Sequence, residues 1–407
     1  MTRTIAIAGA GIGGLAAALS LARVGIRVVL LERAETLREV GAGLQISPNA
    51  SRILIDLGLG RALDAVAVRP TAIAIYEARS GRELNRIDLA AAAERHGAPY
   101  WSIHRADLQG ALADAAEAEP LIDLRLGTSF ANAVETEAGV TLTLRTDTGE
   151  ETLGADALIG ADGVWSAVRR TALGIPGAAF TGRTAWRAVV PIEAVPDRYR
   201  RSGGLWIGPD AHLVHYPVHA GSQVNMVAVV KDDWHEEGWN APGDPAFLKS
   251  RFAAWAPAAR DLLGLTDDWL KWALCGMPAA GSPWRRGRIA LLGDAAHAML
   301  PFVAQGAAMS IEDGAVLAGE LASGADIETA LAAYERRRRP RVERIVATAL
   351  ENDRLYHAGG PLAFARDASL KLLPSRLFLA RYDWIYGWRA DQAPHAHAVA
   401  EPDRRRA

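Results

Sequence analysis

The 407-residue sequence has little cysteine, little net charge and no long uncharged apolar run. Its one cysteine, Cys275, excludes a disulfide framework and a CxxC metal site, and it favours a reducing cytoplasm. A formal net charge of −2 gives no reason to expect nucleic acid or an anionic membrane as a partner. No uncharged apolar stretch reaches the 18 or so residues of a membrane span. We therefore predict a soluble cytoplasmic protein.

The N-terminus offers one alternative to that prediction. Arg3 and the small apolar residues 5–21 resemble the first two regions of a signal peptide. The glycine spacing inside the same run explains its composition better, so we interpret it as part of the fold.

Several catalytic signatures are also missing. Neither a G-x-S-x-G nor a P-loop occurs, and His235-Glu236 does not continue into H-E-x-x-H because residue 239 is Trp. Three histidines cluster in residues 211–219, but strand alternation puts His212 on the face opposite to the other two. We predict no metal site.

The first positive signal is a glycine-rich turn between two expected strands. Gly9, Gly11 and Gly14 form G-x-G-x-x-G after the strand 4–8, and Glu32 stands 18 residues further on. The glycines permit a tight turn, approach of a pyrophosphate and close helix packing, while the acid can bind a ribose. The unit predicts a bound dinucleotide and leaves its identity open.

Two later strands also run into polar turns. Residues 155–160 lead to Asp162, and residues 289–292 lead to Asp294, followed by a helix that opens near Gly306. A carboxylate at the end of a buried strand, facing a helix N-terminus, suits a ligand site of an α/β sheet.

Stretches with helical periodicity alternate along the chain with stretches of strand-like runs, which predicts two domains. We expect an α/β fold, with a discontinuous Rossmann-type domain and a mainly antiparallel substrate domain. The basic run 334–341 is interpreted as a solvated helix face, with an electrostatic partner as the alternative. The expected ranges are 1–72, 98–178 and 279–345 for the first domain, 73–97 and 179–278 for the second, and 346–407 for a C-terminal helical segment with a frayed tail.

Together, GAGIGG with Glu32, GADGVWSAVR and GDAAHAMLPFVAQGAAMSIEDG resemble the motifs of the class A, single-component FAD-dependent aromatic hydroxylases. The chain looks most similar to salicylate hydroxylases, 3-hydroxybenzoate 6-hydroxylases and 6-hydroxynicotinate 3-monooxygenases. The resemblance implies FAD as cofactor, bound by residues of the three motifs and the loops between them: Gly9, Gly11, Gly14, Glu32, Arg33, Gln45, Arg105, Asp162, Asp294, Gly306 and Ala307.

The resemblance also implies the reaction. NAD(P)H reduces FAD, dioxygen gives a flavin C4a-hydroperoxide, and one oxygen passes to a small phenolic or hydroxy-heteroaromatic acid. His212 would be the base that forms a phenolate, with Tyr216 beside it in the substrate pocket. Pro301 and Phe302 would make the facing loop apolar. Some relatives have a second polar residue in that loop, so a two-residue proton relay is not expected here.

Three alternatives remain open at this point. The same fold could act on a larger polycyclic or polyketide-like substrate, or the chain could be a nucleotide-binding redox sensor without turnover. A plain NAD-dependent dehydrogenase is the third. The sequence does not separate NADH from NADPH, and it allows a monomer or a homodimer.

Overall fold

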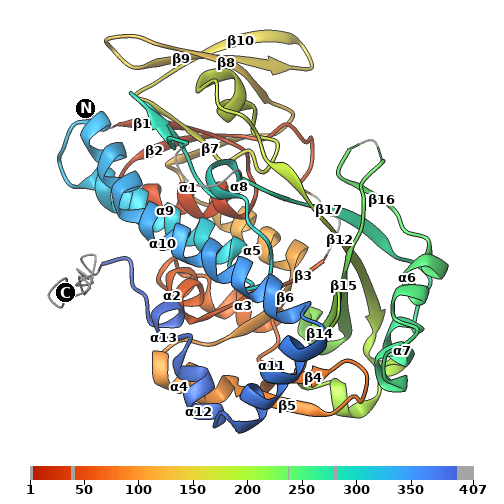
Figure 1. Cartoon of the computed structure of the whole chain (residues 1–407). Coiled ribbons are helices and arrows are strands. Elements are labelled where there is room, and N and C mark those ends of the chain that lie inside the picture. Colours follow the sequence, from red (N-terminus) through yellow and green to blue (C-terminus); the bar gives the residue numbers. More distant parts are fainter. Residues whose placement is uncertain (1–2, 38–41, 237, 278–281, 392–407) are drawn as a thin grey trace, which may run out of the picture.

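The computed structural model describes residues 3–37, 42–236, 238–277 and 282–391. Most of the expected frayed tail lies outside these ranges. Figure 1 shows the arrangement of the whole chain. The strands are β1 Thr4–Ala8, β2 Arg27–Leu31, β3 Gly43–Ile46, β4 Ala72–Glu77, β5 Glu83–Asp88, β6 Trp101–His104, β7 Ile122–Arg125, β8 Ser129–Glu135, β9 Val140–Thr146, β10 Gly149–Ala155, β11 Ala157–Gly160, β12 Ala179–Pro191, β13 Gly203–Gly208, β14 Ala211–Val218, β15 Gln223–Lys231, β16 Asn240–Pro242, β17 Leu270–Gly276, β18 Arg285–Arg286 and β19 Ile289–Leu291. The α-helices are α1 Ile12–Arg23, α2 Pro48–Asp56, α3 Gly60–Val66, α4 Leu89–His96, α5 Arg105–Glu117, α6 Pro245–Arg251, α7 Pro257–Leu263, α8 Asp294–His297, α9 Gly306–Ala322, α10 Ile327–Tyr356, α11 Gly360–Leu372, α12 Ser375–Ala380 and α13 Asp383–Tyr386.

The first layer is a six-stranded sheet in the order β18-β19-β11-β1-β2-β7. Five of its strands are parallel, and β18 joins antiparallel at the edge. Helices α1, α5 and α9 pack together beside this sheet and bury its apolar side chains. The alternation and turn signals of residues 121–150 predict antiparallel strands, and this prediction is wrong for β7. Helix α5 precedes that strand and returns the chain parallel to β2.

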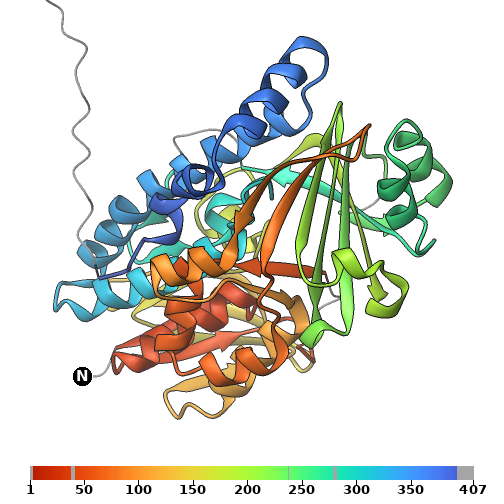
Figure 2. The ribbon, with the colours of Figure 1, turned by 90° about the horizontal axis from the view of Figure 1, so that it is seen from below.

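The second layer is an eight-stranded sheet in the order β16-β17-β12-β15-β14-β13-β4-β5. Its pairs are antiparallel except for β4 with β13, and β4 and β5 form a hairpin. In Figure 2 this sheet, orange and green, stands between the first layer with its helices and the outer helices α6 and α7. The outer face is a tryptophan-rich core, which leaves the inner face for a ligand.

Two smaller sheets complete the strand pairing. Strands β8, β9 and β10 form an antiparallel sheet that projects from one end of the molecule, at the top of Figure 1. Strands β3 and β6 form a two-stranded sheet. Its Gly43 N–H donates to Asn225 of the large sheet, so β3 joins the two halves.

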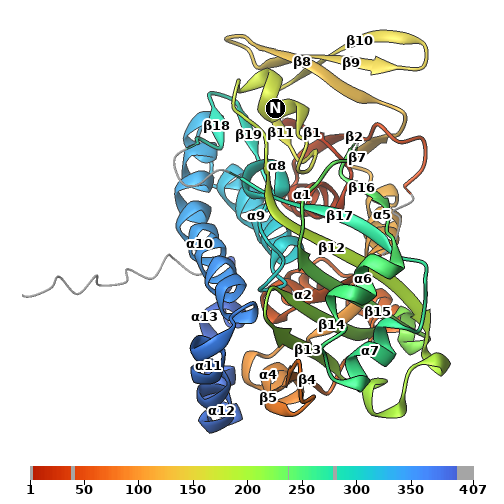
Figure 3. The same ribbon diagram turned by 45° about the vertical axis from the view of Figure 1, so that its right-hand side comes forward.

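Helix α10 runs along one side of the molecule and leads into α11, α12 and α13 (Figure 3). It continues unbroken across residue 345, where we had placed the end of the first domain, so that boundary lies inside a helix. Within the described residues, no helix is both long and apolar enough to cross a membrane.

The basic run on α10 is not simply a solvated face. Arg338 is fully buried, and it pairs with Glu312 at 2.6 Å and with Asp313 at 2.7 Å. Arg341 also reaches Glu312, at 2.6 Å. The solvated interpretation is therefore wrong for these two arginines. A helix face that covers two buried carboxylates must supply the opposite charge, because unpaired buried charges cost several kcal/mol.

Candidate active site

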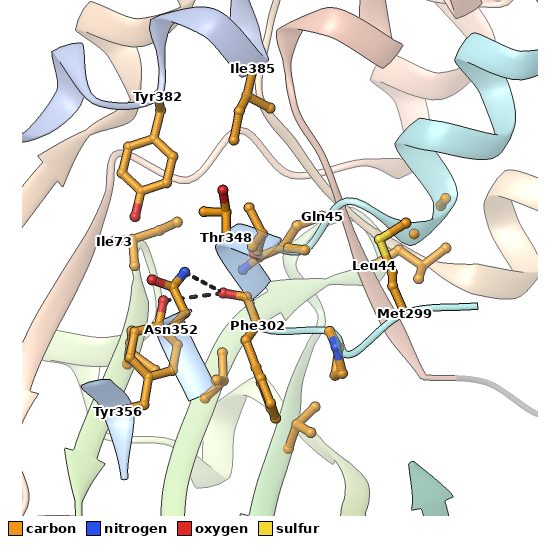
Figure 4. Close-up of a pocket in the computed structure, with 18 of the residues that line it drawn as sticks. Leu44, Gln45, Ile73, Met299, Phe302, Thr348, Asn352, Tyr356, Tyr382 and Ile385 are labelled. Carbon is orange, nitrogen blue, oxygen red and sulfur yellow. Dashed lines mark hydrogen bonds between the residues drawn. The ribbon is translucent and has the colours of Figure 1, made fainter. Parts of the chain in front are cut away.

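A cavity lies between the two large sheets and is closed on one side by the C-terminal helices. Figure 4 shows part of its lining, with Leu44, Gln45 and Met299 on one side and Tyr356, Tyr382 and Ile385 on another. The predicted site residues that line it are Gly11, Gln45, Arg105, His212, Tyr216, Asp294, Pro301, Phe302, Gly306 and Ala307. Residues from five separated parts of the chain thus meet at one cavity.

The glycine-rich turn contributes its backbone. Gly9 has φ 106°, a conformation that favours glycine, and a Cβ on Gly14 would come 1.9 Å from the carbonyl oxygen of Gly9. Gly11 faces open space. Gly9 and Gly14 therefore shape the turn behind the cavity wall, while Gly11 lines the wall itself.

The acid after this turn is placed differently from the cavity residues. Glu32 accepts hydrogen bonds from the backbone N–H groups of Ala10 and Ala34, at 2.9 and 3.0 Å. It stands at the end of β2 beside the turn, outside the cavity lining, and Arg33 next to it is exposed. Their cofactor roles remain predictions.

Asp162 has a structural task of its own. Its carboxylate accepts from the Ala167 and Val168 N–H groups and from the Ser166 hydroxyl, at 2.6, 3.0 and 2.5 Å. It thereby holds the backbone at the start of the π-helical turn Val168–Ala172. Burial raises the pKa of Asp162, although these hydrogen bonds act in the opposite direction. Its neighbours Ala161 and Gly163 line the cavity, whereas Asp162 does not.

The N-terminus of α9 faces the cavity. The first helical residues, Gly306 and Ala307, line it, and the preceding Gln305 is held by Ser47 and Asn49 at 2.9 and 3.0 Å. Backbone N–H groups in a first helical turn have no partner within the helix. They present donors and a positive dipole end to whatever occupies this part of the cavity.

These groups fit a flavin dinucleotide. Gly11 leaves open space for a pyrophosphate, Arg105 supplies positive charge, and Asp294 is exposed toward the cavity, where it can accept from hydroxyl groups. Burial lowers the pKa of Arg105, and nearby Asp294 opposes that effect. Gly306 and Ala307 offer donors for an electron-rich ring edge.

Across the cavity, the inner face of β14 presents His212, Val214 and Tyr216, as strand alternation predicted. His212 is buried and lies edge-on to Phe302, with ring centroids 5.2 Å apart. Phe302 is held by Asn352 and Tyr356, which donate to its carbonyl oxygen at 2.9 and 3.3 Å (Figure 4). The loop is apolar at the cavity, as expected.

A second histidine stands behind the first, and no sequence motif pointed to it. His212 Nδ1 lies 2.8 Å from Nε2 of His357, whose Nδ1 lies 3.0 Å from Asp353. Arg183 pairs with the same carboxylate at 2.6 Å. The expectation of no second relay residue considered only the loop around Pro301, whereas His357 comes from the end of α10.

Arg187 on β12 was also missed. It lines the cavity, and its Nε is buried without a hydrogen-bond partner in the described part of the chain. Its guanidinium lies 5.5 Å from the ring centroid of Trp272. Burial raises the pKa of Tyr216 and the charge of Arg187 opposes this, so the two side chains are near one another. Strand alternation around Trp186 would have put Arg187 on the inner face, had the cavity been known.

His297 has a structural role. Its Nε2 lies 2.6 Å from the buried Asp313, which also accepts from the Gly293 N–H. Among the described residues, no group of three or more His, Cys, Asp or Glu side chains has the arrangement of a metal site.

Comparison with known proteins agrees with this geometry. Residues 2–349 match the family model described as FAD binding domain. The chain is 37% identical to a 3-hydroxybenzoate 6-hydroxylase of Klebsiella oxytoca, over 96% of this chain and 98% of the relative. A Klebsiella pneumoniae HpxO structure with FAD and uric acid has a TM-score of 0.81 at 27% identity, covering 93% of this chain and 95% of that one. A salicylate hydroxylase substrate complex has a TM-score of 0.80 at 28% identity, covering 96% of each.

The fold, the three motifs and these comparisons agree, and they exclude a plain NAD-dependent dehydrogenase. The expected cofactor, FAD, and the expected α/β class are confirmed. The chain belongs to the FAD-binding domain family, and it is a flavoprotein monooxygenase of the aromatic hydroxylase type.

Proposed function

We propose that this enzyme uses NAD(P)H and dioxygen to hydroxylate a small phenolic or hydroxy-heteroaromatic acid. The observation that carries the proposal is the pairing of a neutral base with a cation on one cavity wall. His212 and Tyr216 on β14 and Arg187 on β12 all face the space beside the FAD-binding groups.

The base accounts for the phenol. Burial, His357 and Arg183 together lower the pKa of His212 well below its ordinary value, so this imidazole is neutral at physiological pH. A neutral imidazole can accept the phenol's proton, and the resulting phenolate pushes electron density into the ring that is to be hydroxylated. Bound FAD supplies the redox chemistry, taking electrons from NAD(P)H and activating dioxygen.

The cation accounts for the acid. A half-buried guanidinium without an ionic partner in the described part of the chain is costly unless a ligand neutralises it. A ring carboxylate is the natural partner, since arginine binds carboxylates through two parallel hydrogen bonds. The relatives named for hydroxybenzoate hydroxylation support the same substrate class.

A second candidate follows from the shape of the cavity. It continues past Ile73 and Ile75 to apolar side chains of the C-terminal helices, including Leu370, Phe378 and Ile385. This extension favours a larger aromatic substrate whose reacting ring still meets His212.

A substrate panel separates these two candidates. Purified FAD-loaded enzyme would be incubated with hydroxybenzoates, hydroxypyridine carboxylates and larger polycyclic phenols, and NAD(P)H oxidation, oxygen consumption and hydroxylated product would be measured. Small acids should stimulate all three signals together. Turnover only of the polycyclic compounds would replace the small-acid assignment. Bound FAD with no aromatic-stimulated oxygen consumption would instead support a redox sensor.

A further inference from the structure

A line of hydrogen-bonded side chains leads from the cavity to the edge of α10. It begins at the buried His212, continues through His357 at 2.8 Å, and reaches Asp353 at 3.0 Å. The Asp353 side chain is 22% exposed, whereas that of His357 is 3% exposed. The line therefore connects the cavity wall with solvent through one intermediate imidazole.

The order of donors and acceptors along this line is determined by its charged end. An ionised carboxylate only accepts hydrogen bonds, so Nδ1 of His357 carries the hydrogen. In the neutral form of His357 that this hydrogen implies, Nε2 offers a lone pair, and Nδ1 of His212 is then the donor to it. The remaining nitrogen, Nε2 of His212, holds a lone pair, and no described residue donates to it.

Asp353 is well placed to remain ionised. Burial raises the pKa of this carboxyl, but the hydrogen bond from His357 and the charge of Arg183 outweigh burial, so the pKa is lowered overall. Without Asp353 and His357, a buried neutral His212 could equally carry its hydrogen on Nε2. That tautomer would donate to a phenol oxygen and could not remove its proton.

We propose that His357 and Asp353 are positioning residues that make Nε2 of His212 the proton acceptor and draw the substrate's proton away from the cavity. This inference rests on the proposed function, because it requires a substrate with an ionisable ring hydroxyl. It adds to the site a second histidine from the far end of the chain.

The proton transfer balances as follows. The phenol O–H bond breaks as an N–H bond forms at Nε2 of His212, and the Nδ1–H bond of His212 breaks as one forms at Nε2 of His357. The substrate is left as phenolate, His212 is neutral again, and the positive charge rests on His357 beside Asp353. The carboxylate stabilises this imidazolium without taking the proton, as in a catalytic triad.

Few other ionisable groups face this line in the described part of the chain. From β12 comes Arg183, which Asp353 neutralises. From α10 comes Tyr356, whose pKa is raised well above its ordinary value by burial and which stays a neutral phenol. The remaining neighbour is the uncharged ring of Phe302, 5.7 Å from His357 between centroids. The two histidines are therefore the groups along this line that can pass a proton from one to the other.

The test uses a nitrophenol carboxylate as a probe, since its phenolate form absorbs visible light. The probe would be bound to the oxidised, FAD-loaded enzyme without NAD(P)H, and the ionised fraction would be followed against pH by difference spectra. In the wild type, the probe should ionise at a lower pH than in free solution. In His357→Gln the pH midpoint for ionisation of the bound probe should rise by about one unit. In separate turnover assays with NAD(P)H and a phenolic acid, kcat should fall by at least about tenfold, while KM stays within about twofold of the wild-type value.

A double mutant distinguishes positioning from mere packing. If His357 acts through His212, then His357→Gln should cost nothing further in a His212→Ala background. An equal loss in both backgrounds, or an unchanged midpoint in His357→Gln, would overturn the inference while leaving the hydroxylase assignment intact. A wild-type enzyme that neither ionises the probe nor turns over any phenolic acid would overturn both.

Two further variants guard against misfolding. Asp353→Asn alters a partly exposed side chain and should raise the midpoint in the same direction, so a poorly folded His357→Gln does not end the test. His219→Asn is the matched control, because His219 pairs with Asp107 at 2.9 Å near the end of the same strand but outside the cavity lining. It should keep the wild-type midpoint, and a shift there would show that the probe reports general disturbance.

Discussion

At the scale of single residues, the cavity wall presents the imidazole of His212 and the guanidinium of Arg187, and we expect a specific effect from removing the guanidinium. Arg187→Gln removes the charge that we assign to the substrate carboxylate. A charge-assisted hydrogen bond of this kind contributes roughly 1.5–3 kcal/mol, so KM for the acid should rise by about 10- to 150-fold. KM for the corresponding amide should change little, and steady-state kinetics with both compounds measures the difference.

The control for this prediction is Arg198→Gln. Arg198 lies over Tyr199, 4.7 Å from its ring centroid and outside the main cavity, so both KM values should stay near those of the wild type. If Arg187→Gln weakened acid and amide equally and also released FAD, Arg187 would serve the cofactor and not the substrate.

At the scale of elements, β3 positions Tyr216 from the opposite half of the molecule. A Cβ on Gly43 would lie 2.6 Å from Cε2 of Tyr216 and 2.8 Å from Cβ of Asn225. Gly43→Ala must therefore move either β3 or the tyrosine. Because small displacements of positioning groups are costly, kcat/KM should fall by about 10- to 100-fold.

Gly154→Ala on β10 is the matched glycine control, since a Cβ there meets nothing within 4 Å. Both variants add one methyl group to a strand, and thermal unfolding would show whether either destabilises the fold. A Gly43→Ala enzyme with wild-type kinetics would mean that the contact between β3 and β14 does not position the site.

At the scale of the whole molecule, a buried ionic network joins the loop after β19 to α9 and α10. Asp313 lies at its centre and contacts the Gly293 N–H, His297 and Arg338. Asp313→Asn removes one of the two buried carboxylates that neutralise the buried charge of Arg338, so the free energy of unfolding at pH 7 should fall by about 3 kcal/mol. Urea unfolding measures this, and Asp123→Asn, in an exposed pair with Arg125, should cost less than about 1 kcal/mol.

The same network gives a pH dependence with a definite sign. Burial raises the pKa of Asp313, but the interactions with His297 and Arg338 outweigh burial and lower the pKa to about 2. A depressed folded-state pKa stabilises the protein above the unfolded-state value of about 4, and that stability is lost as the pH falls toward about 2. The stability gap between wild type and Asp313→Asn should therefore be constant above about pH 5 and shrink below pH 4. A gap that stays constant down to pH 3 would contradict this assignment.

The local spacing of residues was sufficient to predict much of the fold, including the glycine-rich turn of the FAD-binding part of the molecule. Gly9, Gly11 and Gly14 predicted their turn because only glycine suits its conformation and its close contacts. The alternation of residues 211–218 put His212 and Tyr216 on one face because side chains on a strand alternate with period two. Both inferences depend on neighbours in the chain, where a sequence pattern is directly informative.

What the sequence by itself determined is therefore the pair of sheets, the strand ends that meet at the cavity, and the strand face that His212 and Tyr216 share. Only the tertiary structure brought His357 behind His212, put Arg187 near Tyr216 and turned Arg338 inward. His357 is 145 residues from its partner. Such contacts depend on strand register and on where a distant helix packs, and these follow from burial across the whole molecule and not from local periodicity.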